Sequence, residues 1–177
     1  MKKLTALLLA LLMMLSLSAC NLSDLLGSKD RDDDTPSHNT STNATGDVGE
    51  TQHTYWFDFT VNDAYLTHRV DGERADDGYQ FLVVDMTVKN TFSSEITMYR
   101  YDFQTQWGDG DEDYAWPTSM DADGYFPDSY DLRAGKKRTD QLVFEVPEDC
   151  EDFALAYQEE FENGDTGDVF FVYFSVE

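Results

Sequence analysis

Apolar and polar residues alternate with a period of two over most of the chain from residue 54 onward. Near the start of this region Tyr55, Phe57, Phe59 and Val61 fall on one face, and mainly polar residues fall on the other. Strict alternation places every second side chain on the same face of an extended backbone, so it predicts half-buried β-strands. The segment 81–90 repeats the pattern with four inward positions: Leu82, Val84, Met86 and Val88.

Further strands are predicted by the same alternation, and turn-forming residues separate them. No segment has a convincing helical period, so the pattern predicts an all-β domain, an antiparallel β-sandwich. The additional strands are expected at residues 95–107, 138–146, 153–158 and 169–176, with Gly- and Asp-rich turns at 70–78, 108–113, 121–131 and 163–168.

The N-terminus has the order of regions found in secretory signal peptides. Lys2 and Lys3 precede an apolar run that extends from Leu4 to Leu17, and small residues follow it. The run is about 14 residues long, and a membrane-spanning helix needs about 20. Residues 1–19 are therefore predicted to be a cleaved signal peptide.

The residues at the end of this segment resemble a lipobox, the site at which bacteria attach lipid to a cysteine. The sequence there is Leu-Ser-Ala-Cys over residues 17–20. The resemblance implies that Cys20 is lipidated and becomes the first residue of the mature chain. Two acyl chains would hold the protein firmly to a membrane. The predicted location is the outer face of the cell membrane, and a Gram-positive surface is favoured.

Residues 20–53 are rich in Ser, Thr, Asn, Asp and Gly. A segment with so few apolar side chains cannot bury enough surface to offset its ordering entropy, so it is predicted to be a disordered tether. The remaining segment, residues 54–177, has the length of one domain. The chain carries 36 acidic and 12 basic residues, a formal net charge of −24, which excludes nucleic acid as a partner.

Cys150 is the only cysteine that remains if Cys20 is lipidated. No intramolecular disulfide can then form. The sequence has no basic or imidazole-bearing neighbour that would lower the thiol pKa. We therefore expect a buried, unreactive thiol, and pairing with another chain is the alternative.

Three motifs, in this order, resemble the DUF4352 group of Ig-like bacterial lipoprotein domains. Residues 84–91 (VDMTVKNT) correspond to a strand end, residues 102–110 (DFQTQWGDG) to a hairpin and residues 132–147 (LRAGKKRTDQLVFEVP) to a later strand. Ala134 departs from the proline usual in the group, and the acidic insertion at 109–131 has no counterpart. The resemblance implies a fold and a location. It implies no activity.

The segment 107–131 is the predicted interaction site, because loops on a rigid sandwich commonly carry function. Its aromatic side chains could anchor a protein partner or stack on a glycan. Packing of the same rings over the end of the core is the alternative interpretation. The predicted binding residues are Trp107, Tyr114, Trp116, Tyr125 and Tyr130.

The same segment contains alternating carboxylates, which are oxygen ligands of the kind that calcium prefers. An EF-hand is excluded, because its sixth and twelfth loop positions are occupied by Tyr114 and Met120 instead of Gly and Glu. A different kind of calcium site remains open, and a solvated hairpin is the alternative. The residues concerned are Asp109, Asp111, Asp113, Asp121 and Asp123.

Sequence motifs of the common enzyme classes do not occur, and no Cys/His pair has metal-binding spacing. The prediction is a non-catalytic lipoprotein that binds a protein or glycan and needs no cofactor. Two alternatives stay open. One is a calcium-dependent or glycan-binding module that uses residues 107–131, and the other is a passive structural protein of the cell envelope.

Overall fold

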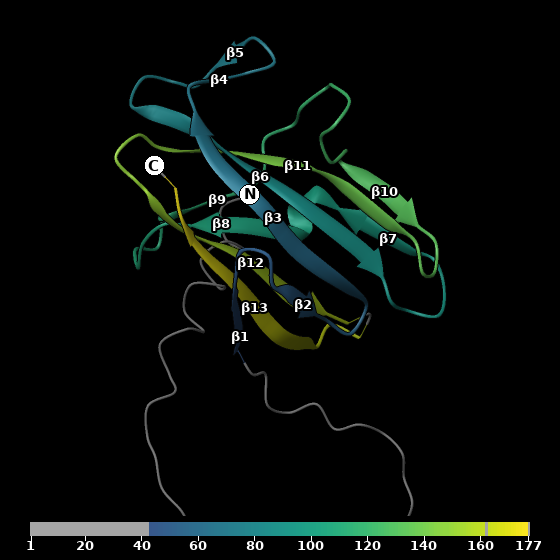
Figure 1. Cartoon of the computed structure of the whole chain (residues 1–177). Helices are drawn as coiled ribbons and strands as arrows, with labels where there is room; N and C mark the ends of the chain where they lie inside the picture. The colour runs from purple at the N-terminus through teal and green to yellow at the C-terminus, as the bar shows by residue number, and fades with distance from the viewer. Residues whose placement is uncertain (1–42, 162, 177) are drawn as a thin grey trace, which may run out of the picture. The chain divides into compact units, whose positions relative to one another are not determined.

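The computed structural model describes residues 43–161 and 163–176, in which β-strands joined by loops and turns predominate (Figure 1). One 3₁₀ helix, η2 (Arg100–Asp102), interrupts the strands. The strands are β1 (Asn43–Asp47), β2 (Thr51–His53), β3 (Phe57–Thr67), β4 (Arg69–Val70), β5 (Glu73–Arg74), β6 (Tyr79–Asn90), β7 (Ile96–Tyr99), β8 (Phe103–Gln106), β9 (Tyr114–Ala115), β10 (Ser129–Leu132), β11 (Lys137–Pro147), β12 (Asp152–Glu160) and β13 (Thr166–Ser175).

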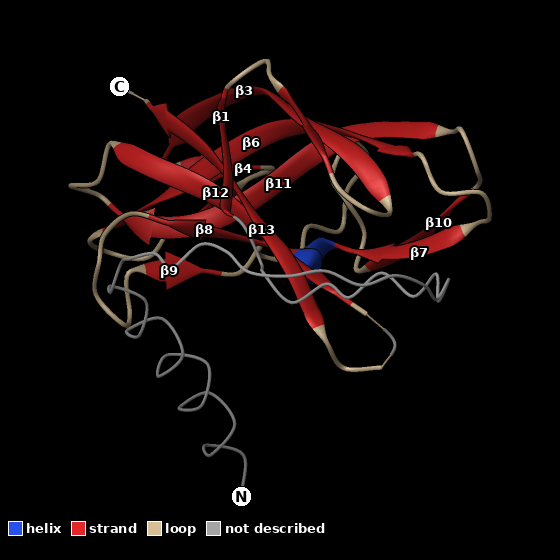
Figure 2. Ribbon diagram, turned by 90° about the horizontal axis from the view of Figure 1, so that it is seen from below, coloured by secondary structure: helices blue, strands red, loops and turns tan. Residues whose placement is uncertain are grey.

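Two sheets form the sandwich, which confirms the predicted fold class. One has the strand order β11-β6-β3-β2, and the other has the order β1-β13-β12-β8-β9 (Figure 2). Neighbouring strands are antiparallel except for β1, which pairs in parallel with β13. Two short antiparallel pairs lie outside these sheets: the hairpin β4-β5, and β10-β7, whose strands are distant in sequence.

The core lies between the facing sheets, and the predicted inward faces are confirmed for β3 and β6. Phe59, Val61, Leu82, Val84 and Val88 have no exposed surface. Aromatic rings fill much of the space between the sheets, with Phe59 in edge contact with Phe103 at a centroid distance of 5.3 Å. Edge contacts of this kind suit the charge distribution of aromatic rings and add to the burial of apolar area.

Two strand predictions need correction. Tyr55 was expected to face inward, but 52% of its side chain is exposed, because β3 begins only at Phe57. The expected strand 95–107 is divided into β7 and β8 by η2, where the carboxylate of Asp102 accepts a bond from the backbone N–H of Tyr99. The inward residues change from even positions, Ile96 and Met98, before η2 to odd positions, Phe103 and Thr105, after it. The expected single strand did not take this change of phase into account.

The predicted domain boundary at residue 54 is wrong. β1 and β2 lie within the segment expected to be a tether, so the ordered domain begins by Asn43. Main-chain bonds to β13 and β3 hold these strands, and Gln52 is 7% exposed. Composition misses this order, since edge strands are held largely by backbone groups that every residue carries. The expected signal peptide, Cys20 and residues 20–42 of the expected tether lie outside the described residues.

The insertion after β8 covers an edge of the first sheet. The backbone N–H of Thr118 donates to Val143 O at 2.7 Å, and Tyr125 forms a bridge with Gln141. β11 is the outermost strand of its sheet, so these bonds satisfy main-chain groups that would otherwise be open to pairing. Met120 and Tyr125 also pack on a second small cluster outside the sandwich, made of Val70, Ala75, Phe81, Val83 and Val143.

Asn90 fixes the loop between β6 and β7. Its side chain is fully buried, and its amide donates to Ser94 O at 2.8 Å and to Leu132 O at 2.7 Å. Its carbonyl oxygen accepts from the N–H of Phe92 at 2.8 Å. The described residues include no helix with the length and hydropathy needed to cross a bilayer.

Candidate functional site

The structure separates the five aromatic residues predicted as a binding site. Tyr114 and Trp116 are 41% and 47% exposed, and their rings meet edge to face at 6.3 Å. Trp107 and Tyr130 pack on the main core, and Tyr125 packs on the second cluster. The interpretation of these rings as an extension of the core is therefore right for three of the five.

Tyr130 illustrates why a ring in a loop need not be a binding residue. Its ring lies 5.5 Å from that of Phe126, and the guanidinium of Arg138 stands 5.0 Å above it. Burial raises the pKa of its hydroxyl far above the usual value, so this group stays protonated at physiological pH. Tyr130 closes the core and presents little surface to a ligand.

Of the aspartates predicted as calcium ligands, Asp113 bonds to the backbone of its own turn. The carboxylate of Asp113 accepts from the N–H of Gly110 at 2.8 Å, which closes the turn after β8. Within residues 43–161 and 163–176, no group of three or more His, Cys, Asp or Glu side chains is placed to hold a metal ion. Asp109, Asp111, Asp113, Asp121 and Asp123 thus form no such group.

This arrangement leads to a prediction about calcium. Adding millimolar calcium should raise the melting temperature of the protein no more than the same concentration of magnesium does, because both ions then act only by screening acidic charge. Thermal unfolding in EGTA, calcium and magnesium measures this. A calcium-specific rise that disappears in the double variant with Asp109→Asn and Asp113→Asn would contradict it.

Cys150 is a free, half-buried cysteine within the described part of the chain, and it packs against the main core. Burial raises the pKa of its thiol, and the nearby carboxylate of Asp149 adds to the rise. The thiol is therefore predominantly protonated at neutral pH. A protonated thiol is a poor nucleophile, which agrees with the expectation of an unreactive cysteine.

Four aromatic rings that sequence reasoning did not group together meet at one end of the sandwich. Tyr55 contacts Trp56 at a centroid distance of 4.7 Å and Phe161 at 5.5 Å, and Trp56 contacts Phe92 at 4.8 Å. The rings come from three loops, before β3, after β6 and after β12. We call Tyr55, Trp56, Phe92 and Phe161 the loop-end aromatic cluster.

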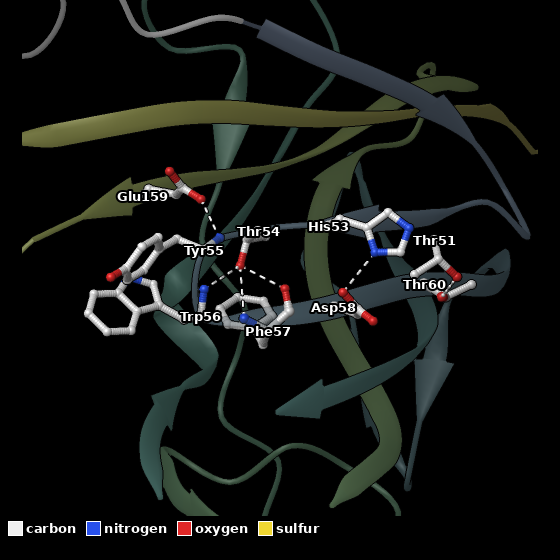
Figure 3. A network of polar contacts seen from close by, with 9 residues as sticks. All are labelled: Thr51, His53, Thr54, Tyr55, Trp56, Phe57, Asp58, Thr60 and Glu159. Atoms are coloured by element: carbon white, nitrogen blue, oxygen red, sulfur yellow. Dashed lines mark hydrogen bonds and ion pairs between the residues drawn. The ribbon is translucent and has the colours of Figure 1, made fainter. Parts of the chain in front are cut away.

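Hydrogen bonds hold the first of these loops in one conformation. The hydroxyl of Thr54 donates to Phe57 O at 2.7 Å and accepts from the N–H groups of Trp56 and Phe57 at 3.2 Å and 3.0 Å. The N–H of Phe92 donates to Trp56 O at 3.1 Å, which joins the second loop to the first. The tight turn at Thr54 directs the rings of Tyr55 and Trp56 to the same side (Figure 3).

Glu159, in β12, joins the first loop to the strands on either side of the third loop. This carboxylate is 6% exposed and accepts from the N–H of Tyr55 at 2.7 Å (Figure 3). It also accepts from the N–H of Asp168 at 3.1 Å. Bonds from N–H groups to an ionised carboxylate are stronger than bonds between neutral groups. The loop-end aromatic cluster is thus a preformed surface, in which Tyr55 is half exposed and its three neighbours are partly exposed.

The sequence contains one clue to this cluster. Trp56 occupies a position that alternation assigns to the polar face, although it is a large apolar residue. Phe92 and Phe161 lie just beyond the ends of β6 and β12, where turn-forming polar residues would be ordinary. Each departure is slight in itself, and only the fold brings them together.

Two charged residues of η2, Arg100 and Asp102, are buried or partly buried. Burial raises the pKa of the Asp102 carboxyl from 3.8 to about 6, while its bond from Tyr99 N–H opposes the rise. Arg100 is 5% exposed and contacts Asp128 Oδ1 at 3.2 Å. Its Nε has no hydrogen-bond partner among the described residues.

An open pocket of about 510 Å³ lies at the β4-β5 pair and is lined mainly by polar residues. His68, Arg69 and Arg74 contribute positive or titratable groups, and Glu148 faces His68 with an Nε2 to Oε1 distance of 3.6 Å. Its basic and acidic groups occur together, so the pocket has no clear preference for a charged ligand.

Comparison with known proteins identifies the family. The model of a family described as "Domain of unknown function (DUF4352)" matches residues 46–168, which is more than half of the chain. The chain belongs to the DUF4352 family. This confirms the resemblance carried by the three sequence motifs, and the match begins within β1, in agreement with the corrected domain boundary. No curated protein matches the chain.

Solved structures share the fold of this DUF4352 domain at low sequence identity. A Bacillus subtilis protein named "putative lipoprotein (ycdA)" has a TM-score of 0.58 and 18% identity over 71% of this chain, which spans only 38% of that protein. The yjhA protein of Bacillus subtilis has a TM-score of 0.56 and 18% identity, with 75% and 99% of the two chains covered. The secreted protein MPT63 of Mycobacterium tuberculosis has a TM-score of 0.54 and 14% identity, with 74% and 98% covered.

Proposed function

We propose that this DUF4352 protein is a lipid-anchored, extracytoplasmic binding module without catalytic activity, and that its loop-end aromatic cluster contacts a protein partner. The observation that carries the proposal is the set of four rings, drawn from three loops and held by main-chain hydrogen bonds. Tyr and Trp are enriched among residues that dominate binding energy. A rigid surface loses little conformational entropy when it binds.

The location outside the membrane is supported by the N-terminal sequence. Lys2 and Lys3, the apolar run and the small residues before Cys20 follow the order of a lipoprotein signal. Two proteins of the same fold carry names that agree with this location, since one is called a putative lipoprotein and the other a secreted protein. Lipid on Cys20 would then keep the domain at the surface.

The absence of catalytic activity is part of the proposal and has two lines of support. His53 Nδ1 contacts the carboxylate of Asp58 at 2.8 Å, and His68 faces Glu148. Neither of these two described histidines hydrogen-bonds to a hydroxyl or thiol group of another described residue. Cys150 carries a raised thiol pKa. Neither arrangement resembles a nucleophile with its general base.

A protein partner suits the cluster better than a lipid bilayer does. Aromatic rings can also insert at the membrane interface. However, the chain carries a formal net charge of −24, and the surface of an anionic membrane repels such a charge. A protein surface with apolar pockets and basic groups at its rim would complement both the rings and the acidic surroundings.

Site-specific photo-crosslinking in the cell of origin tests the proposal. A photoreactive phenylalanine analogue at position 55 of the full chain should give an adduct with one protein, identified by mass spectrometry. The same analogue at Tyr79 is the matched control, because Tyr79 is 45% exposed and lies at the other end of β6 from the loop of Phe92.

The proposal also predicts that removing a ring of the cluster lowers the yield of the crosslinked adduct. Trp56→Ala should lower the yield of the adduct at position 55 at least about tenfold, since truncating a central aromatic anchor commonly costs about 2 kcal/mol or more, roughly thirtyfold in affinity. Circular dichroism checks that the variant stays folded. Adducts with lipid alone, or protein adducts no stronger than those from position 79, would refute the protein partner.

A further inference from the structure

The outer face of the sheet β1-β13-β12-β8-β9 has an unusual composition for this chain. Strand register places residues of three neighbouring strands beside one another: Ala156 lies between Phe171 and Gln104, and Ala154 lies between Tyr173 and Gln106. Their neighbours along each strand point into the core, among them Val172, Leu155 and Thr105, none of which has exposed surface. We call the outward set the neutral face: Phe171, Tyr173, Ala154, Ala156, Gln104 and Gln106.

No residue of the neutral face is charged, although 27% of the whole chain is Asp, Glu, Lys or Arg. The rows continue to Thr45 on β1 and to Tyr114 on β9, which are also uncharged. Two carboxylates border the face: Asp47 beside Tyr173, and Asp152 in the next outward position before Ala154 on β12. The outer face of the other sheet differs, since Asp58 and Lys89 stand opposite each other there. Charge is thus confined to the border of the neutral face, and its interior offers no charged group to a partner.

Aromatic rings form one side of the neutral face. Phe171 and Tyr173 are stacked, with centroids 6.0 Å apart and an interplanar angle of 22°. Tyr173 is 50% exposed. Tyr114 lies three strands away in the same row, about 14 Å at the usual strand spacing. Flat, exposed rings at such separations can stack against successive units of an extended ligand.

Amide groups form the other side. The side chains of Gln104 and Gln106 are half-buried and make no side-chain hydrogen bond with any residue that the structure describes. Each amide offers two donors and one acceptor oxygen. Between the rings and the amides lie two alanines, which are 6% and 5% exposed and do not project beyond their larger neighbours. Rings, small side chains and unused amides without charge suit a ligand that has both apolar faces and hydroxyl groups.

We propose that the neutral face binds an extended, uncharged polysaccharide. The rings of Phe171 and Tyr173 contact the apolar faces of sugar units, and the amides of Gln104 and Gln106 hydrogen-bond their hydroxyl or acetamido groups. The match in charge favours this occupant, because a neutral polymer is not repelled by the acidic protein and needs no basic side chain. This site differs from the loop-end aromatic cluster, so it adds a second ligand to the proposed function.

Retention on insoluble polysaccharide tests the inference. The probe polymers are chitin and cellulose, and the protein is the chain from residue 20 with Cys20→Ser, which contains every described residue. We expect retention on at least one polymer that does not change between about 50 mM and about 500 mM NaCl, since salt screens charges and the ligand has none. Tyr173→Ala should weaken retention about tenfold, the effect of losing one aromatic contact.

Two further variants make the test specific. Gln104→Glu keeps the shape of the side chain but removes its amide donors, and it should weaken retention several-fold. Tyr65→Ala is the matched control, because Tyr65 is 43% exposed and lies on the other sheet. It should leave retention unchanged, and thermal melts of all variants check folding.

Several results would overturn the inference. The first is that neither chitin nor cellulose retains the protein. The second is retention that Tyr173→Ala and Gln104→Glu leave intact, and the third is retention that high salt abolishes. Self-association that Tyr173→Ala removes would instead assign the face to a second copy of the chain. The crosslink from position 55 should persist in Tyr173→Ala, so the failure of either proposal is recognised separately.

Discussion

Asn90→Asp should destabilise the domain by about 4 kcal/mol, because each buried polar group left without a partner costs about 1–3 kcal/mol. The amide of Asn90 donates to two carbonyl oxygens, Ser94 O and Leu132 O. A carboxylate cannot donate to either, and it would place negative charge against both oxygens in a site with no exposed surface. The total stability of a domain is commonly about 5–15 kcal/mol, so the loss is large.

Urea unfolding measures this effect. Thr91→Asp is the matched control, since it adds the same charge at the next residue, which is exposed. It should change the free energy of unfolding by less than about 0.5 kcal/mol, as surface substitutions usually do. Asn90→Asp should recover part of its stability at low pH, where a protonated carboxyl can donate one bond. Equal stability of the two variants would show that the Asn90 hydrogen bonds contribute little.

Asp102→Asn should make the protein more stable above pH 6 by about 2–3 kcal/mol, because a pKa that differs by one between the folded and unfolded chains changes the free energy of unfolding by about 1.4 kcal/mol. Burial raises the pKa of Asp102 from 3.8 to about 6 in the folded protein. Its carboxylate is thus better accommodated in the unfolded chain. Folding is therefore favoured while the Asp102 carboxyl is protonated. This contribution to stability is present in full below the unfolded pKa of 3.8, and it is lost as the pH rises from about 4 to about 6.

An uncharged amide at position 102 removes this dependence and can still accept the bond from Tyr99 N–H. Free energies of unfolding measured from about pH 3 to about pH 8 should converge for the two proteins at low pH and diverge between the unfolded and folded pKa values of Asp102. Asp111→Asn provides the comparison for loss of one exposed acidic charge, since Asp111 is exposed. A constant difference between Asp102→Asn and the native protein at every pH would contradict the assignment of the raised pKa to Asp102.

Asn90 depends on a contact with a segment distant in sequence, and Asp102 combines a local bond to Tyr99 with burial. Asn90 could be recognised as a strand-end residue, but its bond to Leu132 depends on how β10 packs. Asp102 lies in a segment that alternation assigned to a strand. Local pattern identifies which residues face a core, and it does not show which polar groups are brought into contact across the sheet.

The candidate binding sites also depend on contacts that the sequence does not show. The insertion was expected to hold a single aromatic site, but the structure leaves only Tyr114 and Trp116 of its five predicted binding residues strongly exposed. The loop-end aromatic cluster joins Tyr55 to Phe161, and the neutral face joins β13, β12 and β8. Neither set could be assembled from sequence, because the strand order of a sandwich does not follow the order along the chain.

The sequence by itself determined the β-sandwich class, the inward faces of β3 and β6, the DUF4352 family and the acidic character of the surface. These properties follow from local periodicity, from composition and from motifs whose order is fixed along the chain. Only the tertiary structure decided that β1 and β2 belong to the domain, that η2 divides a predicted strand, and that four rings from three separate loops meet. The physical reason is that edge pairing uses backbone groups common to all residues, and that a surface site depends on which strands become neighbours.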